Sequence, residues 1–223
     1  MAPKKFRKNK KTSIDKLQNK RLKDIEQKLA KNFETKLCRS LTQEQLVSSS
    51  PGGISGFMSI PIDATVNGRI GNKVNLINTT YRLMLRQNEG SSGDATNVCR
   101  ILIVESKDGT QSLTWENVMY RTPANNVNVY TAINSGYNTD ITTNKNYRVV
   151  YDSGVINMSF NAAKQTKAIN YTRKYGKGGK ELVFFGDGTT PTNFKQTVLF
   201  ISDSAASPHP VLALDVNNRY EDA

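Results

Sequence analysis

The sequence predicts an all-β domain of antiparallel strands, preceded by a basic arm and an amphipathic helix. Three observations predict this arrangement. Positive charge is concentrated in the first 40 residues, a helical period of apolar residues is confined to the same region, and short β-type runs separated by polar turns follow it. No helical crossovers separate those runs, which favours antiparallel over parallel strands.

The charge of the chain is unevenly distributed. Residues 1–40 contain 14 lysines and arginines against four aspartates and glutamates, a net of +10 out of +12 for the whole chain. The remaining residues are therefore almost neutral. This division is typical of a polyanion-binding tail on a separate scaffold and not of a uniformly basic enzyme.

The first eleven residues form the basic arm. They contain six basic side chains and no acid, and Phe6 is the one large apolar group between the basic residues, so we expect residues 1–11 to be disordered. Such a segment neutralises phosphates without sequence preference; a nuclear-localisation signal or a solubilising tail is the alternative. The predicted nucleic-acid-binding residues of the arm are Lys4, Lys5, Arg7, Lys8, Lys10 and Lys11.

Residues 12–45 are predicted to form an amphipathic helix and a linker. Thr12 and Asp15 are a plausible capping pair, and one apolar stripe recurs at mostly three- and four-residue steps from Ile14 to Leu37. The stripe is too thin to fold alone. It predicts either docking on the chain's own body or self-association beside a nucleic acid. The expected self-association residues are Leu22, Ile25, Leu29 and Phe33, and the basic residues that extend the phosphate-binding surface are Lys16, Lys20, Arg21 and Lys23.

The predicted body spans residues 46–223 and begins with a linker rich in Ser, Pro and Gly at residues 46–56. A change of apolar parity near Leu76 and Asn78 predicts a β-bulge. The runs RILIVE and TVLFIS are apolar on both faces and indicate covered central strands. Eight strand-like segments with long polar connections indicate a two-sheet jelly roll. The eight segments are 73–87, 97–105, 146–152, 155–161, 166–173, 182–185, 196–202 and 211–220.

The sequence offers no catalytic constellation, so we predict that the protein is not an enzyme. Its single histidine, His209, lies between two prolines, and Cys38 and Cys99 form no metal spacing. Two cysteines are too few for a disulfide framework and indicate a reduced folding compartment. No apolar run approaches the roughly 18 residues that a membrane span needs, so no membrane partner is expected.

Four stretches in a fixed order carry a family resemblance over residues 65–223. They are NGRIGNKVNL, RILIVESKDG, KNYRVVYDSGVINMSF and the closing LFISDSAASPHPVLALDVNNRYEDA. With the arm and helix before it, the body resembles small icosahedral virus coat proteins, namely that of satellite tobacco necrosis virus and the related jelly-roll capsids of circular single-stranded DNA viruses.

The resemblance implies a capsid protein of the virion, assembled inside the host cell from roughly sixty copies of itself around single-stranded RNA or DNA. No small-molecule substrate is implied. Two alternatives remain at this point. A cellular nucleic-acid-binding protein of ribosomal or chromatin type would be expected to carry basic and aromatic residues on its folded surface. A lectin or cupin-type enzyme would give the arm no role.

The resemblance also implies a calcium ion between subunits. The aspartate next to the last residue of the family corresponds to Asp222, and the backbone carbonyls at the start of the first long strand correspond to Ile70 and Lys73. Together these groups would supply three of the six to eight oxygens that Ca²⁺ prefers. No other cofactor is expected.

Overall fold

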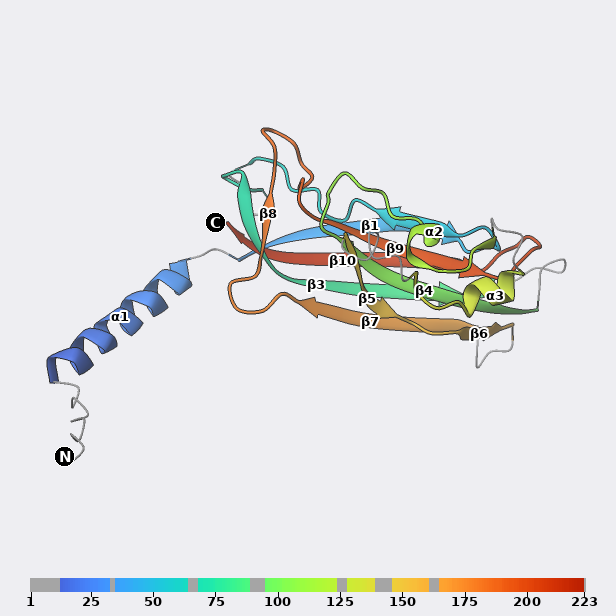
Figure 1. Cartoon of the computed structure of the whole chain (residues 1–223), viewed down its shortest axis with the longest axis horizontal. Coiled ribbons are helices and arrows are strands. Elements are labelled where there is room, and N and C mark those ends of the chain that lie inside the picture. Colours follow the sequence, from blue (N-terminus) through green and yellow to red (C-terminus); the bar gives the residue numbers. More distant parts are fainter. Residues whose placement is uncertain are drawn as a thin grey trace, which may run out of the picture. The chain divides into compact units, whose positions relative to one another are not determined.

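The chain divides into two units, Met1–Glu34 and Thr35–Ala223. The structure, a computed structural model, describes residues 13–32, 35–63, 68–88, 95–123, 128–138, 146–160 and 165–222. The first unit contains α1 (Ser13–Asn32), and the second contains the strands (Figure 1). Asp15 lies in the first turn of α1, where a carboxylate interacts favourably with the positive end of the helix dipole.

Within the described residues the second unit forms two five-stranded sheets. In the first sheet, β1 (Thr35–Leu46), β10 (Val211–Asp222), β3 (Lys73–Arg86) and β7 (Thr166–Lys174) lie side by side in that order, and β8 (Lys180–Val183) also pairs with β3. In the second sheet, the order is β2 (Gly52–Ser55), β9 (Lys195–Ser202), β4 (Thr96–Ser106) and β5 (Tyr147–Asp152), and β6 (Ile156–Ser159) also pairs with β4. Every pairing between these strands is antiparallel.

The strand order is that of a jelly roll. The first strand, β1, pairs with the last, β10, while β2 pairs with the penultimate strand, β9, in the other sheet. The chain thus passes from one sheet to the other as β1, β2, β3 and β4 follow one another. This arrangement confirms the predicted all-β, antiparallel, two-sheet jelly roll.

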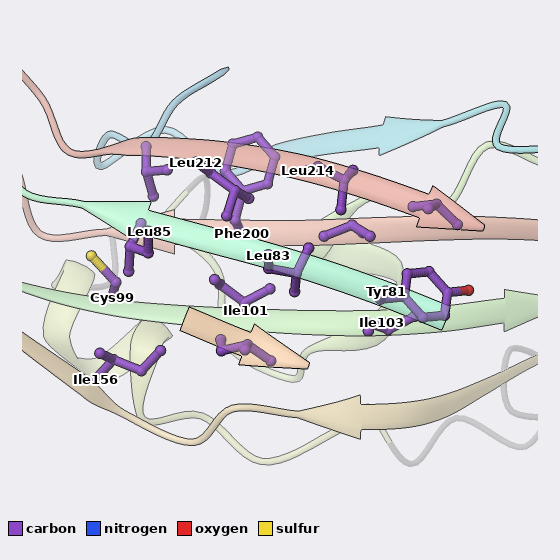
Figure 2. Packing of buried hydrophobic residues seen from close by; sticks show 14 of the residues in the cluster. Tyr81, Leu83, Leu85, Cys99, Ile101, Ile103, Ile156, Phe200, Leu212 and Leu214 are labelled. Carbon is purple, nitrogen blue, oxygen red and sulfur yellow. The ribbon is translucent and has the colours of Figure 1, made fainter. Parts of the chain in front are cut away.

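The main core lies between the two sheets (Figure 2). Tyr81, Leu83 and Leu85 alternate along β3 and pack in one cluster with Ile101 and Ile103 of β4. The change of parity before Tyr81 corresponds to a register shift, since Asn78 pairs with Arg219 while Leu76 pairs with Tyr220 and leaves Ile77 unmatched. The predicted bulge is therefore confirmed.

A second core lies on the outer side of the β4–β9 sheet. There α2 (Trp115–Val118) and α3 (Val129–Ile133), both from the connection between β4 and β5, cover the sheet. Trp115 and Ile133 belong to one cluster with Leu102, Val104 and Leu199. This cover explains why RILIVE and TVLFIS are apolar on both faces and confirms that they are central, covered strands.

The predicted boundary at residue 46 is wrong. The helix ends at Asn32, and residues assigned to helix and linker form β1, while part of the predicted entry loop forms β2. In β1 the usual pattern of apolar side chains inside and polar side chains outside is reversed. Lys36 and Cys38 are buried, whereas Leu37 and Leu41 are exposed. A polar strand with outward leucines gives no β-type signal and extends the helical period. With the observed boundary, residues 1–34 hold 12 basic and four acidic residues, a net of +8.

Candidate functional site

The predicted phosphate-binding residues fall into two groups. Lys4, Lys5, Arg7, Lys8, Lys10 and Lys11 lie outside the described residues. Lys16, Lys20 and Lys23 follow one another at four- and three-residue steps on α1, so they share a face, and they are exposed, as is Arg21. This face of α1 therefore presents three lysine ammonium groups to solvent, with Asp24 one turn after Lys20.

The predicted self-association stripe also begins on α1. Leu17, Leu22 and Ile25 are exposed along this helix. Leu29 lies on α1 as well, but its side chain is outside the described part, as is all of Phe33. Three large apolar side chains in contact with water on one 20-residue helix leave an apolar surface that a partner would cover.

The predicted calcium residue, Asp222, instead binds a lysine. Lys36 of β1 is 2% exposed, and its Nζ donates hydrogen bonds to Asp222 Oδ2 at 2.7 Å and to the carbonyl of Gly68 at 3.0 Å. The hydroxyl of Tyr220 donates to the same carbonyl at 3.2 Å. The ammonium therefore joins β1, the end of β10 and the loop before β3.

The expected calcium site lies between subunits and stays a prediction, but one oxygen of its carboxylate already has a partner within the chain. The ammonium of Lys36 occupies Oδ2 of Asp222, whereas Oδ1 of the same carboxylate is buried without a hydrogen-bond partner. Ile70 is 74% exposed. The side chain of Lys73 pairs with Glu181 at 3.1 Å, and this ion pair does not involve the Lys73 carbonyl that was predicted as a ligand. In the described part of the chain, no three His, Cys, Asp or Glu side chains are placed to share a metal.

Arg69 is a structural residue that the sequence did not single out within the stretch GRIGNK. Its buried guanidinium donates to the carbonyls of Gly186 and Gly188, at 2.9 and 2.8 Å, and lies 4.4 Å from the centre of the Phe184 ring. It also donates to the carbonyl of Gly71. The motif that carries part of the family resemblance thus fixes two loops at one end of the sandwich.

A buried polar chain crosses from one sheet to the other. Tyr175 donates to Glu105 Oε1 at 2.7 Å, and Gln196 Nε2 donates to the Tyr175 hydroxyl at 3.0 Å and to Thr79 Oγ1 at 2.8 Å. Thr79 in turn donates to Asn218 Oδ1 at 2.7 Å. Burial and the nearby Glu105 carboxylate raise the pKa of Tyr175, so its hydroxyl stays protonated as a donor.

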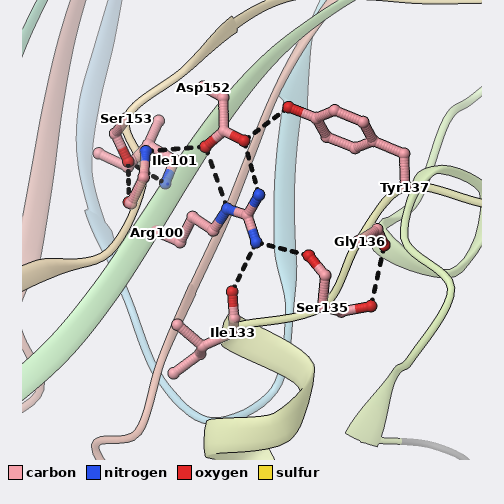
Figure 3. Close-up of polar contacts among 9 residues, drawn as sticks. Arg100, Ile101, Ile133, Ser135, Gly136, Tyr137, Asp152 and Ser153 are labelled. Carbon is pink, nitrogen blue, oxygen red and sulfur yellow. Dashed lines mark hydrogen bonds and ion pairs between the residues drawn. The ribbon is translucent and has the colours of Figure 1, made fainter.

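A second polar cluster supports the α3 connection on the β4–β5 side of the sheet (Figure 3). Arg100 on β4 forms a bidentate pair with Asp152 on β5, at 3.0 and 2.6 Å, and its Nη1 donates to the carbonyls of Ile133 and Ser135 at 2.7 and 2.8 Å. Tyr137 donates to Asp152 Oδ2 at 2.6 Å. One arginine thus holds the end of α3 against the sheet.

The electrostatics of this cluster favour the ion pair. Burial acts to raise the pKa of the Asp152 carboxyl, but the hydrogen bonds from Arg100 and Tyr137 outweigh it and hold that pKa below its ordinary value. Burial and the bond to Asp152 raise the pKa of Tyr137 to about 12. Asp152 is therefore ionised and Tyr137 is neutral at physiological pH.

Neither cysteine is placed for nucleophilic chemistry. Both are free and buried, and burial raises the pKa of the Cys99 thiol to about 12 and that of Cys38 in the same direction. His209 lies in the turn before β10, with Nδ1 3.0 Å from Ser204 Oγ. No helix among the described residues is long and apolar enough to cross a membrane.

The chain is similar in structure to solved structures of viruses, but no protein-family profile and no curated protein matches it in sequence. A structure of Desmodium yellow mottle tymovirus is 8% identical over 85% of this chain and 87% of that one, with a TM-score of 0.35. A structure of tobacco necrosis virus is 10% identical over 86% of this chain and 93% of that one, with a TM-score of 0.31.

Proposed function

We propose that this protein is a capsid protein that assembles with copies of itself into a closed icosahedral shell and retains a single-stranded genome through its N-terminal unit. The observation that carries the proposal is the joining of a jelly-roll body to a separate N-terminal unit that holds +8 of the chain's +12 charge. The function is structural and not enzymatic, and the place of the protein is the virion.

Self-assembly is supported by an exposed apolar row on β1. This strand is at the edge of its sheet, and Leu37, Leu41 and Leu46 on it are exposed. A register shift between Thr42 and Gln45 keeps Leu46 on the same outer face as the other two leucines. Apolar side chains in a row beside an open strand edge are suited to burial against another copy of the chain.

Genome retention is supported by the charge of the N-terminal unit. Phosphate neutralisation by lysine and arginine releases counterions and supplies affinity that does not depend on sequence. At +8 per chain, a shell of about sixty copies would carry on the order of 500 positive charges. The body, which is almost neutral, can then pack against its neighbours without strong mutual repulsion.

The proposal is tested by expressing the full chain and examining it by size-exclusion chromatography and electron microscopy. We expect closed particles of uniform diameter that contain host nucleic acid. A protein that stays monomeric at high concentration, both with and without added single-stranded RNA or DNA, would contradict the proposal.

Deletion of residues 2–11 is expected to spare the fold and to abolish nucleic-acid retention, because six basic residues are lost. The ratio of absorbance at 260 and 280 nm of purified particles measures this loss, and circular dichroism checks the body. Binding of single-stranded oligonucleotides by the intact protein should weaken steeply with salt and differ little between sequences. Wild-type retention by the truncated protein would refute the role of the arm.

Leu22→Asp and Ile25→Asp are each expected to impair assembly much more than they lower the stability of the body. Both side chains are exposed on α1, so the single chain loses little, whereas a charge in a buried helix contact is costly. Asn19→Asp, which adds the same charge at an exposed position of α1 to the side of the stripe, is the matched control. Particle yield by sedimentation and the thermal midpoint of the dissociated protein separate the two effects. Normal particles from both variants would show that the stripe has no role in assembly.

A further inference from the structure

An open groove of about 520 Å³ lies in the connection between β4 and β5, outside both the N-terminal unit and the β1 edge. Its lining comes from two segments. Tyr120 and Arg121 follow α2, and Tyr130, Thr131 and Asn134 lie on or just after α3. A volume of this order accommodates a ligand of one or two rings.

The backbone of the groove is rigidly held. The amide of Arg121 donates to Ser135 Oγ at 2.8 Å, and the amide of Tyr120 donates to the carbonyl of Gly136 at 3.0 Å. Arg100 binds the carbonyls of Ile133 and Ser135 from the sheet side (Figure 3). The groove is therefore largely formed before any ligand arrives, which reduces the entropy cost of binding.

Two aromatic side chains and one cation of the groove are exposed to solvent. Tyr120 is 67% exposed and Tyr130 is 56% exposed, although each could bury a large aromatic surface. Arg121 is exposed beside them, and none of the lining residues is acidic. Two exposed aromatic rings and one cation on a fixed scaffold are a pattern typical of a binding site.

We propose that this groove binds the acidic terminal sugar of a glycan, with the carboxylate of the sugar on Arg121. A guanidinium pairs with a carboxylate in a bidentate geometry. The tyrosine rings offer flat apolar surfaces to the C–H face of a sugar ring, and their hydroxyls, with those of Thr131 and the amide of Asn134, exchange hydrogen bonds with sugar hydroxyls. The groove is thus an attachment site for a sialylated or uronic-acid-containing glycan.

Two other ligand classes fit less well. A single-stranded nucleic acid needs several cations along its backbone, but the groove contributes one, and most of the charge of the chain lies in residues 1–34. An extended peptide needs free backbone groups for pairing, but here the amides of Tyr120 and Asn138 are bonded to the carbonyls of Gly136 and Val118. A small acidic saccharide requires neither.

The test is a titration of the full-length protein with 3′-sialyllactose and, separately, with an unsulfated chondroitin disaccharide. Saturation-transfer difference NMR detects binding of each sugar. Lactose is the neutral control. We expect one of the acidic sugars to bind with a dissociation constant of about 1 mM, and the two arms identify which carboxylated sugar is preferred. Lactose should bind at least about tenfold more weakly, because it cannot pair with Arg121.

Arg121→Gln and Tyr130→Ser should each weaken binding about tenfold or more, whereas Arg148→Gln, a matched loss of an exposed arginine on β5, should not change it. Circular dichroism verifies that all three variants fold. Failure of both acidic sugars to bind at about 10 mM, equal binding of lactose, or unchanged binding by Arg121→Gln overturns the proposal. So does loss of oligonucleotide binding by Arg121→Gln, which would assign the groove to nucleic acid. Shell formation is measured separately and does not depend on the outcome.

Discussion

Arg100→Met is expected to lower the free energy of unfolding of the body by about 3–5 kcal/mol, the cost of breaking a buried, hydrogen-bonded ion pair. Arg100 is 9% exposed and makes four hydrogen bonds, two to Asp152 and two to the carbonyls at the end of α3. Methionine fills much of the same volume but donates none of these bonds. Asp152 then loses its cationic partner and keeps only the hydrogen bonds from Tyr137 and the amide of Gly154, and both carbonyls lose the Arg100 donor.

Urea denaturation followed by tryptophan fluorescence measures this loss, because Trp115 is buried in the cluster that α3 also joins. Arg148→Met, on the neighbouring strand, removes an exposed arginine and should change stability by less than about 0.5 kcal/mol. Arg100→Lys keeps the charge but not the bidentate geometry and should fall between the two. Equal stabilities of Arg100→Met and Arg148→Met would contradict this account.

The ion pair between Arg100 and Asp152 also predicts how the stability of the body changes with pH. The pKa of Asp152 in the folded state lies below its unfolded value of about 3.9. Its contribution to stability is therefore fully present above the unfolded pKa and is lost as pH falls through the folded-state pKa. The deficit of Arg100→Met relative to the wild type should then be largest near neutral pH and shrink below about pH 4.

The sequence predicted those parts of the fold whose apolar pattern matches their environment. The change of parity in β3 located the bulge at Ile77, and the two-faced apolar runs identified β4 and β9 as covered strands. β1 was missed because its inward positions include Lys36 and its leucines point outward. A pattern method assigns such a strand to whatever precedes it, in this case a helix with the same leucine spacing.

The candidate sites were predicted less completely, for a different reason. Asp222 was predicted as a calcium ligand, but within the chain its carboxylate pairs with Lys36, 186 positions away in sequence. Pairing of this kind depends on β1 lying next to β10, which the sequence did not reveal. The same holds for Glu105 and Gln196, which only the packing of the two sheets brings to Tyr175 and Thr79.

Lys36→Met is expected to destabilise the body by about 2–3 kcal/mol, since it leaves the partly buried Asp222 carboxylate and the Gly68 carbonyl without their ammonium partner. Lys73→Met is the matched control. Its partner is Glu181, and both side chains of that pair are about half exposed, so the change should cost less than about 1 kcal/mol. The thermal midpoints of the two variants and the wild type make the comparison.

The same variants separate a lysine from a metal ion as the cation at Asp222. If Lys36 neutralises the carboxylate, EGTA should leave the thermal midpoint of the wild type unchanged, for assembled and dissociated protein alike. Calcium should not rescue Lys36→Met, because one carboxylate and one carbonyl fall well short of the six to eight oxygens that the ion prefers. A wild-type midpoint that falls in EGTA, or a Lys36→Met midpoint that calcium restores, would instead return the ion to this position. An ammonium built into β1 has one consequence that an exchangeable ion does not: it ties the end of β10 to β1 within a single chain, so this closure forms on folding and does not depend on the calcium concentration around the protein.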